Sequence, residues 1–256
     1  MASSPYDLAQ MAAQDLAASR AFPGPDFREV LGWIHEALRP ATYVEIGVYA
    51  GCSLAAVQPH TLAIGIDPDP QQNGCWPTGS RIFRLTSTEF FATHDLRQVL
   101  GGKAVDLALI DGFHLFEQAL EDLCNLERHI APGGVIAVHD TIPLDRVTSA
   151  RTRTTEFYTG DVWKLIPYLR RYRPELEVVT VTAAPTGLTL IRGLNPGYDP
   201  TLLASTAAFA LGFDYFERNR EEFLRTMPNH RSAIQAFCQN TPVQSMASSG
   251  VAMAFR

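Results

Sequence analysis

The sequence predicts an α/β fold: a doubly wound, mostly parallel sheet of seven strands, with helices at both ends of the chain. From residue 41 to residue 140, short apolar runs alternate with segments of helical periodicity. The runs are nearly continuous in apolar residues, which is typical of parallel strands that helices cover on both faces. The last two strands are separated only by a short turn containing Pro185 and Gly187, which predicts an antiparallel C-terminal hairpin.

The expected elements follow in order along the chain. The first forty residues show helical spacing in two segments, which Pro23 and Pro25 separate. Five strands are then expected: ATYVEIGV with its end at Glu45–Ile46, Thr61 to Asp67, Arg81 to Leu85, Ala104 to Asp111, and VIAVHD. Helices are predicted between the later strands, over TEFFATHDLRQVL and from His114 to Ile130.

The pattern changes after Asp161. A helix, DVWKLIPYLRRY, precedes the hairpin strands ELEVVTVTAA and LTLIR. A long helix is predicted at roughly Leu202 to Arg225, and the tail from Gln239 lacks periodicity and is expected to be disordered. The chain therefore divides into an N-terminal helical extension over 1–40, an α/β domain over 41–238 and a flexible tail over 239–256.

Composition excludes several classes of protein. The formal charge is −6 and the isoelectric point is near 5.6, which argues against a nucleic-acid partner. No apolar run approaches the roughly 20 residues of a membrane-spanning helix, and the N-terminus does not have the pattern of a secretory signal. The four cysteines lie far apart and form no CxxC pair, so we expect reduced thiols in a cytoplasmic protein.

The stretch Tyr43 to Leu54, YVEIGVYAGCSL, is the most informative part of the chain. A strand meets a turn from Gly47 to Gly51, and the small residues SLAAV then predict the start of a helix. Such a junction offers backbone N–H groups and the positive end of a helix to a ligand. Glu45 adds a negative charge at the strand's end, which suits an ammonium or sulfonium group better than a pyrophosphate.

Three side chains that can bind metal follow neighbouring strands. Asp111 ends one strand, and His139 and Asp140 end the next. Ligands of open α/β sheets bind outside the carboxyl ends of the strands, so these groups can converge there. Two carboxylates and an imidazole suit a divalent ion such as magnesium or manganese. The alternative is that the aspartates only cap the helices that follow.

The ordered motifs resemble those of the class I S-adenosylmethionine-dependent methyltransferases, over about Ala41 to Arg192. The closest likeness is to the metal-dependent O-methyltransferases of the catechol and caffeoyl-CoA type, and to their relatives in macrolide-sugar and cephalosporin biosynthesis. EIGVYAGCS resembles the first motif of the caffeoyl-CoA group, while IDGFHLFEQALEDL and APGGVIAVHDT resemble the metal and general-base segments of the sugar-modifying group. The resemblance implies a Rossmann-like fold.

The resemblance also implies roles for individual residues. The cofactor would be held by Glu45, Gly47 and Gly51 around its methionine part, by Ser53 through a hydroxyl or helix-start donor, by Asp67 at the ribose, by Ser87 at the adenine rim, and by Asp111. A divalent metal, magnesium first and manganese or iron as alternatives, would lie on Asp111, His139 and Asp140. His114 would take the proton from the substrate hydroxyl. A tight turn for the glycines and local helix capping for Ser53, Ser87 and His114 are the structural alternatives.

Two positions depart from the families' usual pattern. Tyr49 stands where a glycine is commonest, which favours the metal-dependent branch and weakens a dinucleotide-binding interpretation, because no GxGxxG occurs. His139 stands where the resembled families usually have a carboxylate or another oxygen ligand. This departure leaves its role as a ligand open and would shift the metal preference toward manganese, iron or zinc.

The predicted activity is O-methylation of a small-molecule hydroxyl acceptor, for example a sugar-containing or polyhydroxylated metabolite. Two alternatives stay open: a metal-dependent hydroxylase or hydrolase on the same fold, and a non-catalytic partner protein that binds the cofactor. The segment Thr141 to Gly160 is a candidate lid, with Asp145, Arg146 and Tyr158 as candidate substrate contacts. Apolar stretches in the C-terminal third could serve a homodimer.

Overall fold

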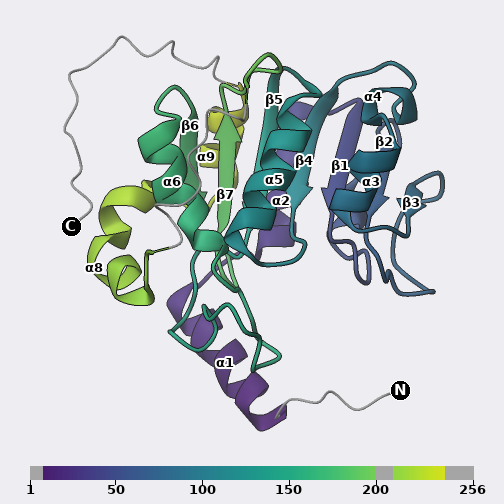
Figure 1. The fold of residues 1–256 in the computed structure, drawn as a ribbon. Coiled ribbons are helices and arrows are strands. Elements are labelled where there is room, and N and C mark those ends of the chain that lie inside the picture. Colours follow the sequence, from purple (N-terminus) through teal and green to yellow (C-terminus); the bar gives the residue numbers. More distant parts are fainter. Residues whose placement is uncertain (1–7, 200–209, 240–256) are drawn as a thin grey trace.

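The computed structural model describes residues 8–199 and 210–239, and its centre is an eight-stranded sheet (Figure 1). The strand order is β3-β2-β1-β4-β5-β7-β6-β8. The strands are β1 (Thr42–Ile46), β2 (Leu62–Ile66), β3 (Arg81–Phe83), β4 (Val105–Ile110), β5 (Ile130–His139), β6 (Glu177–Val181), β7 (Leu188–Arg192) and β8 (Thr226–Met227). Only β7 runs antiparallel to its neighbours, β5 and β6, so the predicted mostly parallel sheet with a C-terminal hairpin is confirmed.

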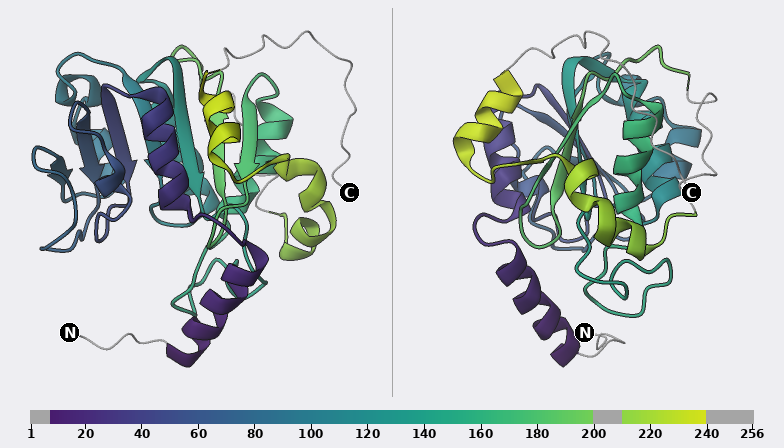
Figure 2. Two further views of the ribbon diagram at one scale, coloured as in Figure 1. Left: turned by 180° about the vertical axis from the view of Figure 1, so that it is seen from behind. Right: turned by 90° about the vertical axis from the view of Figure 1, so that its left-hand side faces the viewer.

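Helices cover both faces of the sheet (Figures 1 and 2). One face carries α3 (Ser87–Thr93), α4 (Leu96–Val99), α5 (Phe116–Glu127) and α6 (Leu165–Tyr172), with α8 (Phe213–Leu224) packed against α6. The other face carries α2 (Phe27–Leu38) and α9 (Arg231–Gln239), which lie side by side although they come from opposite ends of the chain. The fold is therefore doubly wound, as predicted.

Side chains along the central strands point alternately to the two faces of the sheet, and they fill two separate hydrophobic cores. In β4, Ala108 and Ile110 pack into the core beneath α5, whereas Leu107 and Leu109 pack toward α2. All four side chains are almost completely buried. Burial of a Leu or Ile side chain stabilises a fold by about 1.5–3 kcal/mol, so the packing on both faces of the sheet contributes to stability.

Helix α1 (Leu8–Ala21) lies apart from the sheet and projects from the end where the parallel strands finish (Figures 1 and 2). Within it, Gln14 and Ala18 are buried, whereas Leu16 is 51% exposed. Helix α2 begins at a conventional cap, because the Asp26 carboxylate accepts the N–H groups of Arg28 and Glu29. It ends at Arg39, which has a left-handed backbone.

The structure differs from the sequence-based elements in several places. A short 3₁₀ helix, η1 (Leu54–Ala56), stands where SLAAV predicted a longer helix, because Pro59 disfavours a helical residue before it. The segment TEFFATHDLRQVL forms two helices because the Asp95 side chain caps a new one, α4. The two-residue strand β8 and helix α9 were not predicted.

The C-terminal predictions are only partly testable. In place of one helix over Leu202 to Arg225, α8 covers Phe213–Leu224, and residues 202–209 lie outside the described residues. Most of the predicted flexible tail, residues 240–256, also lies outside them. In the described part of the chain, no helix combines the length and the apolar character needed to cross a membrane. All four cysteines are free thiols.

Candidate active site

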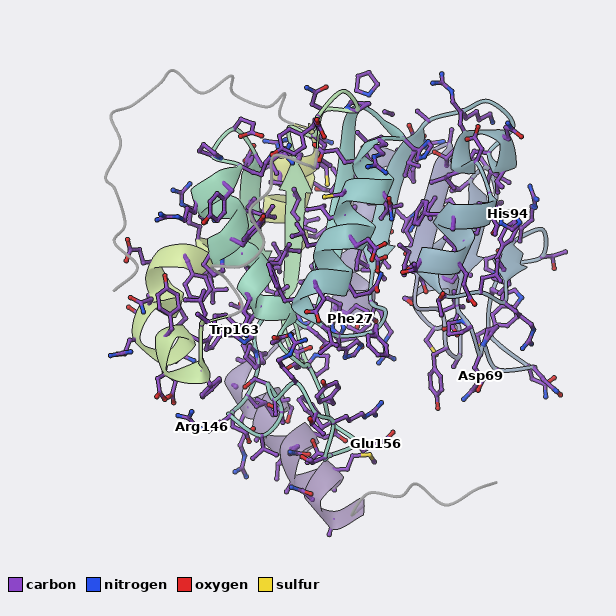
Figure 3. The ribbon with its side chains drawn as sticks, viewed as in Figure 1. Phe27, Asp69, His94, Arg146, Glu156 and Trp163 are labelled. Carbon is purple, nitrogen blue, oxygen red and sulfur yellow. The ribbon has the colours of Figure 1, made fainter. Side chains whose placement is uncertain are left out.

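A cavity of about 900 Å³ lies outside the carboxyl ends of β1, β2, β4 and β5. Its walls come from the Gly turn after β1, the residues after β2 and β4, the end of β5, the segment 153–158, the hairpin turn at 185–186 and the start of α2. Phe27 and Glu156 lie on this side of the sheet in Figure 3. Most of the predicted site residues meet here: Gly47, Ser53, Asp67, Ser87, Asp111, His114, His139 and Asp140.

The Gly turn is fixed by close backbone packing. Gly47 has φ +87°, and a Cβ atom there would lie 2.0 Å from the backbone oxygen of Asp111. The Asp111 N–H in turn donates to the Ile46 oxygen at 2.8 Å. Gly51 has φ +72° and lies against the ring of Trp76, and it does not line the cavity. The two glycines therefore make the tight turn possible, and Gly47 sets the distance between the ends of β1 and β4.

Asp67 is tied to this turn by hydrogen bonds. One carboxylate oxygen accepts the N–H groups of Val48 at 2.8 Å and Tyr49 at 2.7 Å, and the other accepts the N–H of Asp69 at 2.7 Å. The N–H groups of Gly47 and Gly51 also bond within the protein. The expected set of free N–H donors is therefore largely used internally, and no α-helix follows to supply a strong dipole.

Glu45 is completely buried and does not line the cavity. Its carboxylate accepts hydrogen bonds from the Tyr43 hydroxyl at 2.6 Å and from the Ser53 hydroxyl at 2.7 Å. Burial raises the pKa of Glu45 to about 8, although these two hydrogen bonds act in the opposite direction. Ser53 does line the cavity, and its hydroxyl makes no helix-capping bond. Glu45 can thus reach a ligand in this cavity only through Ser53.

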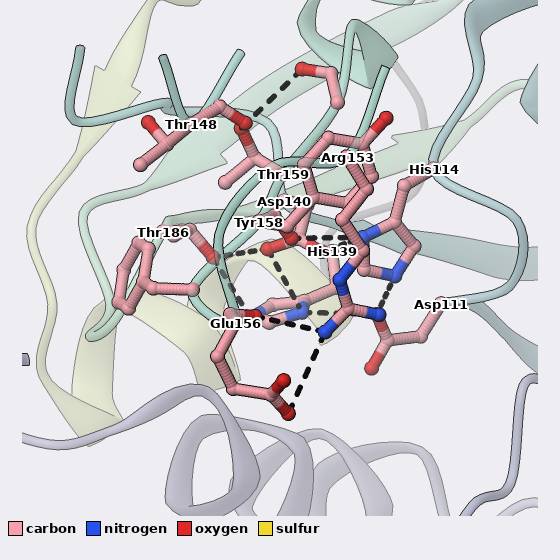
Figure 4. Close-up of polar contacts among 12 residues, drawn as sticks. Asp111, His114, His139, Asp140, Thr148, Arg153, Glu156, Tyr158, Thr159 and Thr186 are labelled. Carbon is pink, nitrogen blue, oxygen red and sulfur yellow. Dashed lines mark hydrogen bonds and ion pairs between the residues drawn. The ribbon is translucent and has the colours of Figure 1, made fainter. Parts of the chain in front are cut away.

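Asp111, His139 and Asp140 form a compact cluster (Figure 4). Each offers a ligand atom, and these atoms all lie within 4.8 Å of one another. His139 Nδ1 is 3.1 Å from Asp111 Oδ1 and 3.5 Å from Asp140 Oδ1. The ring of Phe27 stacks on the His139 ring at 3.8 Å between centroids, which holds the imidazole in place. Asp140 has φ +59°, a left-handed backbone that turns its side chain back into the cavity.

Hydrogen bonds of the Thr186 hydroxyl indicate which ring nitrogen of His139 carries the proton. The other nitrogen then faces the carboxylates with a lone pair. The Thr186 hydroxyl donates to Asp140 Oδ1 at 2.5 Å and lies 3.2 Å from His139 Nε2. Because its hydrogen is used on Asp140, the hydroxyl accepts from Nε2–H. The Nδ1 lone pair then points at two carboxylate oxygens, an arrangement that needs a cation between them.

Either a metal ion or a second proton on His139 meets that need. Burial alone lowers the pKa of His139, but the charges of Asp140 and Asp111 outweigh it and raise the pKa to about 9. The pKa of Asp111 is lowered, because the charges of His139 and His114 outweigh its burial. The cluster is thus electrostatically built around one positive charge, and its mixed O/N donor set fits a divalent transition metal or magnesium.

His114 stands beside this cluster with a defined orientation. Its Nδ1 lies 3.0 Å from Asp140 Oδ2 and 3.0 Å from the Tyr158 backbone oxygen, both of which are acceptors. A neutral His114 therefore carries its proton on Nδ1, and its Nε2 lone pair lies on the side of Asp111, 3.7 Å from Oδ1. The helix-capping alternative is not observed, because the Phe116 N–H at the start of α5 bonds to Asp161 instead.

Only the C-terminal part of the candidate lid borders the cavity. Arg153, Glu156 and Tyr158 line the cavity. Arg146 instead pairs with Asp214 on α8, and Asp145 bonds to Thr148 within the segment; neither residue lines the cavity. Trp163, on the segment that follows the candidate lid, is buried in the core.

Sequence patterns missed several cavity residues. Phe27 and Arg28 come from α2, Gln118 from α5 and Thr186 from the hairpin turn. The only signal for Gln118 was its position one turn after His114, on the face of the helix that begins at the cavity. Phe27, Arg28 and Thr186 carry no sequence signal, because they reach the site through tertiary packing alone.

Comparison with known proteins identifies the fold and a matching domain. Residues 44–141 match a family model described as a methyltransferase domain. The cofactor-bound structure of Rv0187 from MTB is 15% identical, covers 74% of this chain and 91% of its own, and has a TM-score of 0.50. A proposed O-methyltransferase from Klebsiella pneumoniae is 17% identical, with coverage of 76% and 93% and a TM-score of 0.50. No curated protein matches the sequence.

The sheet order and the cavity at the strand ends agree with the matched domain. Residues 44–141 thus resemble a methyltransferase domain, and the fold is that of the two solved structures, in agreement with the resemblance that the motifs carry. The sheet has β8 as an edge strand beyond the seven strands that the sequence predicts.

Proposed function

We propose that this enzyme transfers the methyl group of S-adenosylmethionine to a hydroxyl oxygen of a small-molecule acceptor, with a divalent metal at the Asp111–His139–Asp140 cluster. The supporting observation is that His114 and this cluster meet in the same cavity as the Gly turn. A methyl donor near the turn and a hydroxyl near His114 would then lie side by side.

The cofactor half of the proposal uses the predicted residues around the turn. Asp67 accepts three backbone N–H groups, which leaves one lone pair, on Oδ1, suited to a ribose hydroxyl. Ser53 donates to Glu45, so its free lone pairs suit an ammonium group of the methionine part. Gly47 and Gly51 shape the turn, Ser87 would lie at the adenine end, and Asp111 would face the cofactor from the cluster.

The chemical step is a displacement at the sulfonium methyl carbon. The acceptor oxygen forms the new C–O bond, the S–CH₃ bond breaks with its electrons on sulfur, and S-adenosylhomocysteine leaves. His114 Nε2 takes the hydroxyl proton, while Asp140 and the Tyr158 carbonyl hold Nδ1–H. A bound divalent ion would lower the pKa of the hydroxyl and fix its oxygen. We propose magnesium first, with manganese or iron as alternatives that the nitrogen of His139 would favour.

The acceptor side of the cavity suits a polar metabolite. Arg28, Arg153 and Glu156 line it together with the rings of Phe27 and Tyr158. Polar groups of both charges over aromatic surfaces suit a sugar-containing or polyhydroxylated acceptor. The matched domain favours methyl transfer over hydroxylation or hydrolysis on the same fold.

Two measurements test the proposal. A panel of small hydroxylated acceptors is screened for release of S-adenosylhomocysteine before and after dialysis against a strong chelator, with magnesium or manganese added back. We expect activity to disappear on chelation and to return with metal. Binding of Mn²⁺, followed by electron paramagnetic resonance, should be lost in Asp111→Asn and kept in Glu217→Gln, an exposed control on α8. Full turnover after chelation would remove the metal and leave protonated His139 as the cation.

A further inference from the structure

The start of α2 and the hairpin turn lie side by side in the cavity wall, although they are far apart in the sequence. Phe27 from α2 stacks on the His139 ring at 3.8 Å, and the Thr186 hydroxyl from the hairpin turn lies 3.2 Å from His139 Nε2. The two segments meet at Ala184, whose carbonyl oxygen accepts the Phe27 N–H at 2.8 Å. The imidazole of His139 is therefore held by two segments that have to stay together.

A side chain from the C-terminal part of the chain lies against both of these segments. Asn229 follows the edge strand β8 and precedes α9. Its Nδ2 donates to the backbone oxygen of Pro25 at 2.9 Å and to that of Thr182 at 3.5 Å. Pro25 lies just before the first turn of α2, and Thr182 directly follows β6 in the hairpin. One amide group thus joins the entry into α2 to the hairpin.

The orientation of the Asn229 amide follows from these contacts. Both neighbouring groups are carbonyl oxygens, which only accept hydrogen bonds, so the NH₂ group has to face them. Asn229 Oδ1 is buried and has no hydrogen-bond partner among the described residues, a state that costs free energy. The two donated bonds are therefore the polar interactions that hold this side chain, and they act on α2 and on the hairpin at once.

Other contacts attach the same C-terminal segment, residues 226–239, to the fold. β8 pairs with β6, and α9 packs along α2. Arg231 forms an ion pair with Glu36 on α2, between side chains that are 56% and 44% exposed. Glu36 lies about two turns along α2 from Phe27, so this ion pair holds the segment without acting on the cavity wall. Arg231 thus offers a matched control for Asn229.

We propose that Asn229 is a positioning residue for the metal cluster: by joining Pro25 to Thr182, it keeps the Phe27 ring stacked on His139. The inference rests on the proposed function, in which His139 is a metal ligand. Without the two bonds, the backbone pairing at Ala184 is left to hold the α2 entry against the hairpin. An imidazole whose stacking partner moves away turns more easily, and a ligand that turns binds its metal less tightly.

Nuclear magnetic resonance of the histidine rings in the metal-free full chain tests the positioning directly. A long-range ¹H–¹⁵N spectrum reports both His139 and His35, which is buried on α2 with its ring against Tyr43. Asn229→Leu keeps the approximate size of the side chain and removes both donated bonds. We expect the His139 ring protons to shift downfield in this variant, because the Phe27 ring no longer shields them, while the His35 signals stay in place.

Metal binding gives a second readout. The affinity for Mn²⁺, followed by electron paramagnetic resonance, should fall by roughly 5- to 10-fold in Asn229→Leu, less than the loss expected for a residue that contacts His139 itself. Arg231→Gln removes the ion pair from the same segment and should leave both the His139 signals and the Mn²⁺ affinity unchanged.

The outcomes separate this proposal from the one on which it rests. Unchanged His139 signals in Asn229→Leu overturn the positioning role. A shift of His35 as large as that of His139 also overturns it, because the whole of α2 would then have loosened, and so does an equal loss of Mn²⁺ affinity in Arg231→Gln. If the unaltered protein binds no Mn²⁺, the metal of the proposed function is refuted, while the ring signals still decide whether Asn229 positions His139.

Discussion

Replacement of Gly47 by alanine tests whether the Gly turn sets the geometry of the site. A Cβ atom at Gly47 would lie 2.0 Å from the Asp111 oxygen and 2.5 Å from its carbonyl carbon, both of them backbone atoms. Real Cβ atoms essentially never approach other atoms closer than 3.0 Å. The chain must therefore open by about an ångström between β1 and β4 to admit the methyl group.

The loss of unfolding free energy expected for Gly47→Ala has two parts, the left-handed backbone and the clash. A control variant separates them. Gly79 also has a positive φ, +97°, but a Cβ there would meet nothing within 4 Å. Gly79→Ala should therefore cost only the left-handed backbone, about 1–2 kcal/mol of unfolding free energy. Gly47→Ala adds the clash and should cost about 3 kcal/mol or more, a large part of a typical stability of about 5–15 kcal/mol.

Urea unfolding followed by circular dichroism measures the two free energies, and Mn²⁺ titration measures the effect on the metal cluster. We expect Gly47→Ala to weaken Mn²⁺ binding, since Asp111 is displaced, and Gly79→Ala to leave it unchanged. Equal losses of stability in both variants, with Mn²⁺ binding intact, would show that the contact between the turn and Asp111 does not determine the site.

Three other substitutions probe single interactions. His114→Gln should lower kcat by about 100-fold to 10,000-fold while the Kd of S-adenosylhomocysteine stays the same; an unchanged kcat would exclude His114 as the base. Thr186→Val should weaken Mn²⁺ binding by about 10–100-fold, because it frees the His139 ring, whereas Thr182→Val in the same loop should not. The raised pKa of Glu45, about 8 against 4.5, means that the folded state holds the extra proton and that stability falls as pH rises through this window. Glu45→Gln should therefore gain stability relative to the unaltered protein between pH 5 and pH 8, by at most about 1.4 kcal/mol per pH unit, and parallel pH profiles would contradict the burial argument.

The parts of the fold that depend on local patterns were predictable from the sequence. Near-continuous apolar strands such as β4 and β5 and the Pro/Gly turn of the hairpin gave the sheet and the antiparallel direction of β7. The parts that depend on distant packing were not. Helix α9 is a short segment that is stabilised against α2 from the other end of the chain, and β8 pairs through only two residues.

The same distinction applies to the site. Asp111 and Asp140 could be located because strand ends at one edge of a parallel sheet share a crevice. The predicted strand already places Tyr43 and Glu45 on one face, but the hydrogen bond from Ser53 to Glu45 depends on how the turn folds back and could not be foreseen. Thr186 and Phe27 likewise reach His139 from the hairpin turn and from α2, with no sequence pattern to connect them.

Asp111 links the two halves of the proposed reaction through its backbone as much as through its carboxylate. Its backbone N–H and carbonyl oxygen contact Ile46 and Gly47 in the Gly turn, while its side chain contacts His139 in the Asp111–His139–Asp140 cluster. Methyl transfer requires the reacting atoms to meet within about 3–3.5 Å, and an error of about 1 Å can cost 100-fold in rate. Because Asp111 belongs to both the Gly turn and the Asp111–His139–Asp140 cluster, it would fix the distance between the methyl donor and the acceptor oxygen without any closing motion. For this reason we expect variants at the Gly47–Asp111 contact to lower kcat more than they raise KM.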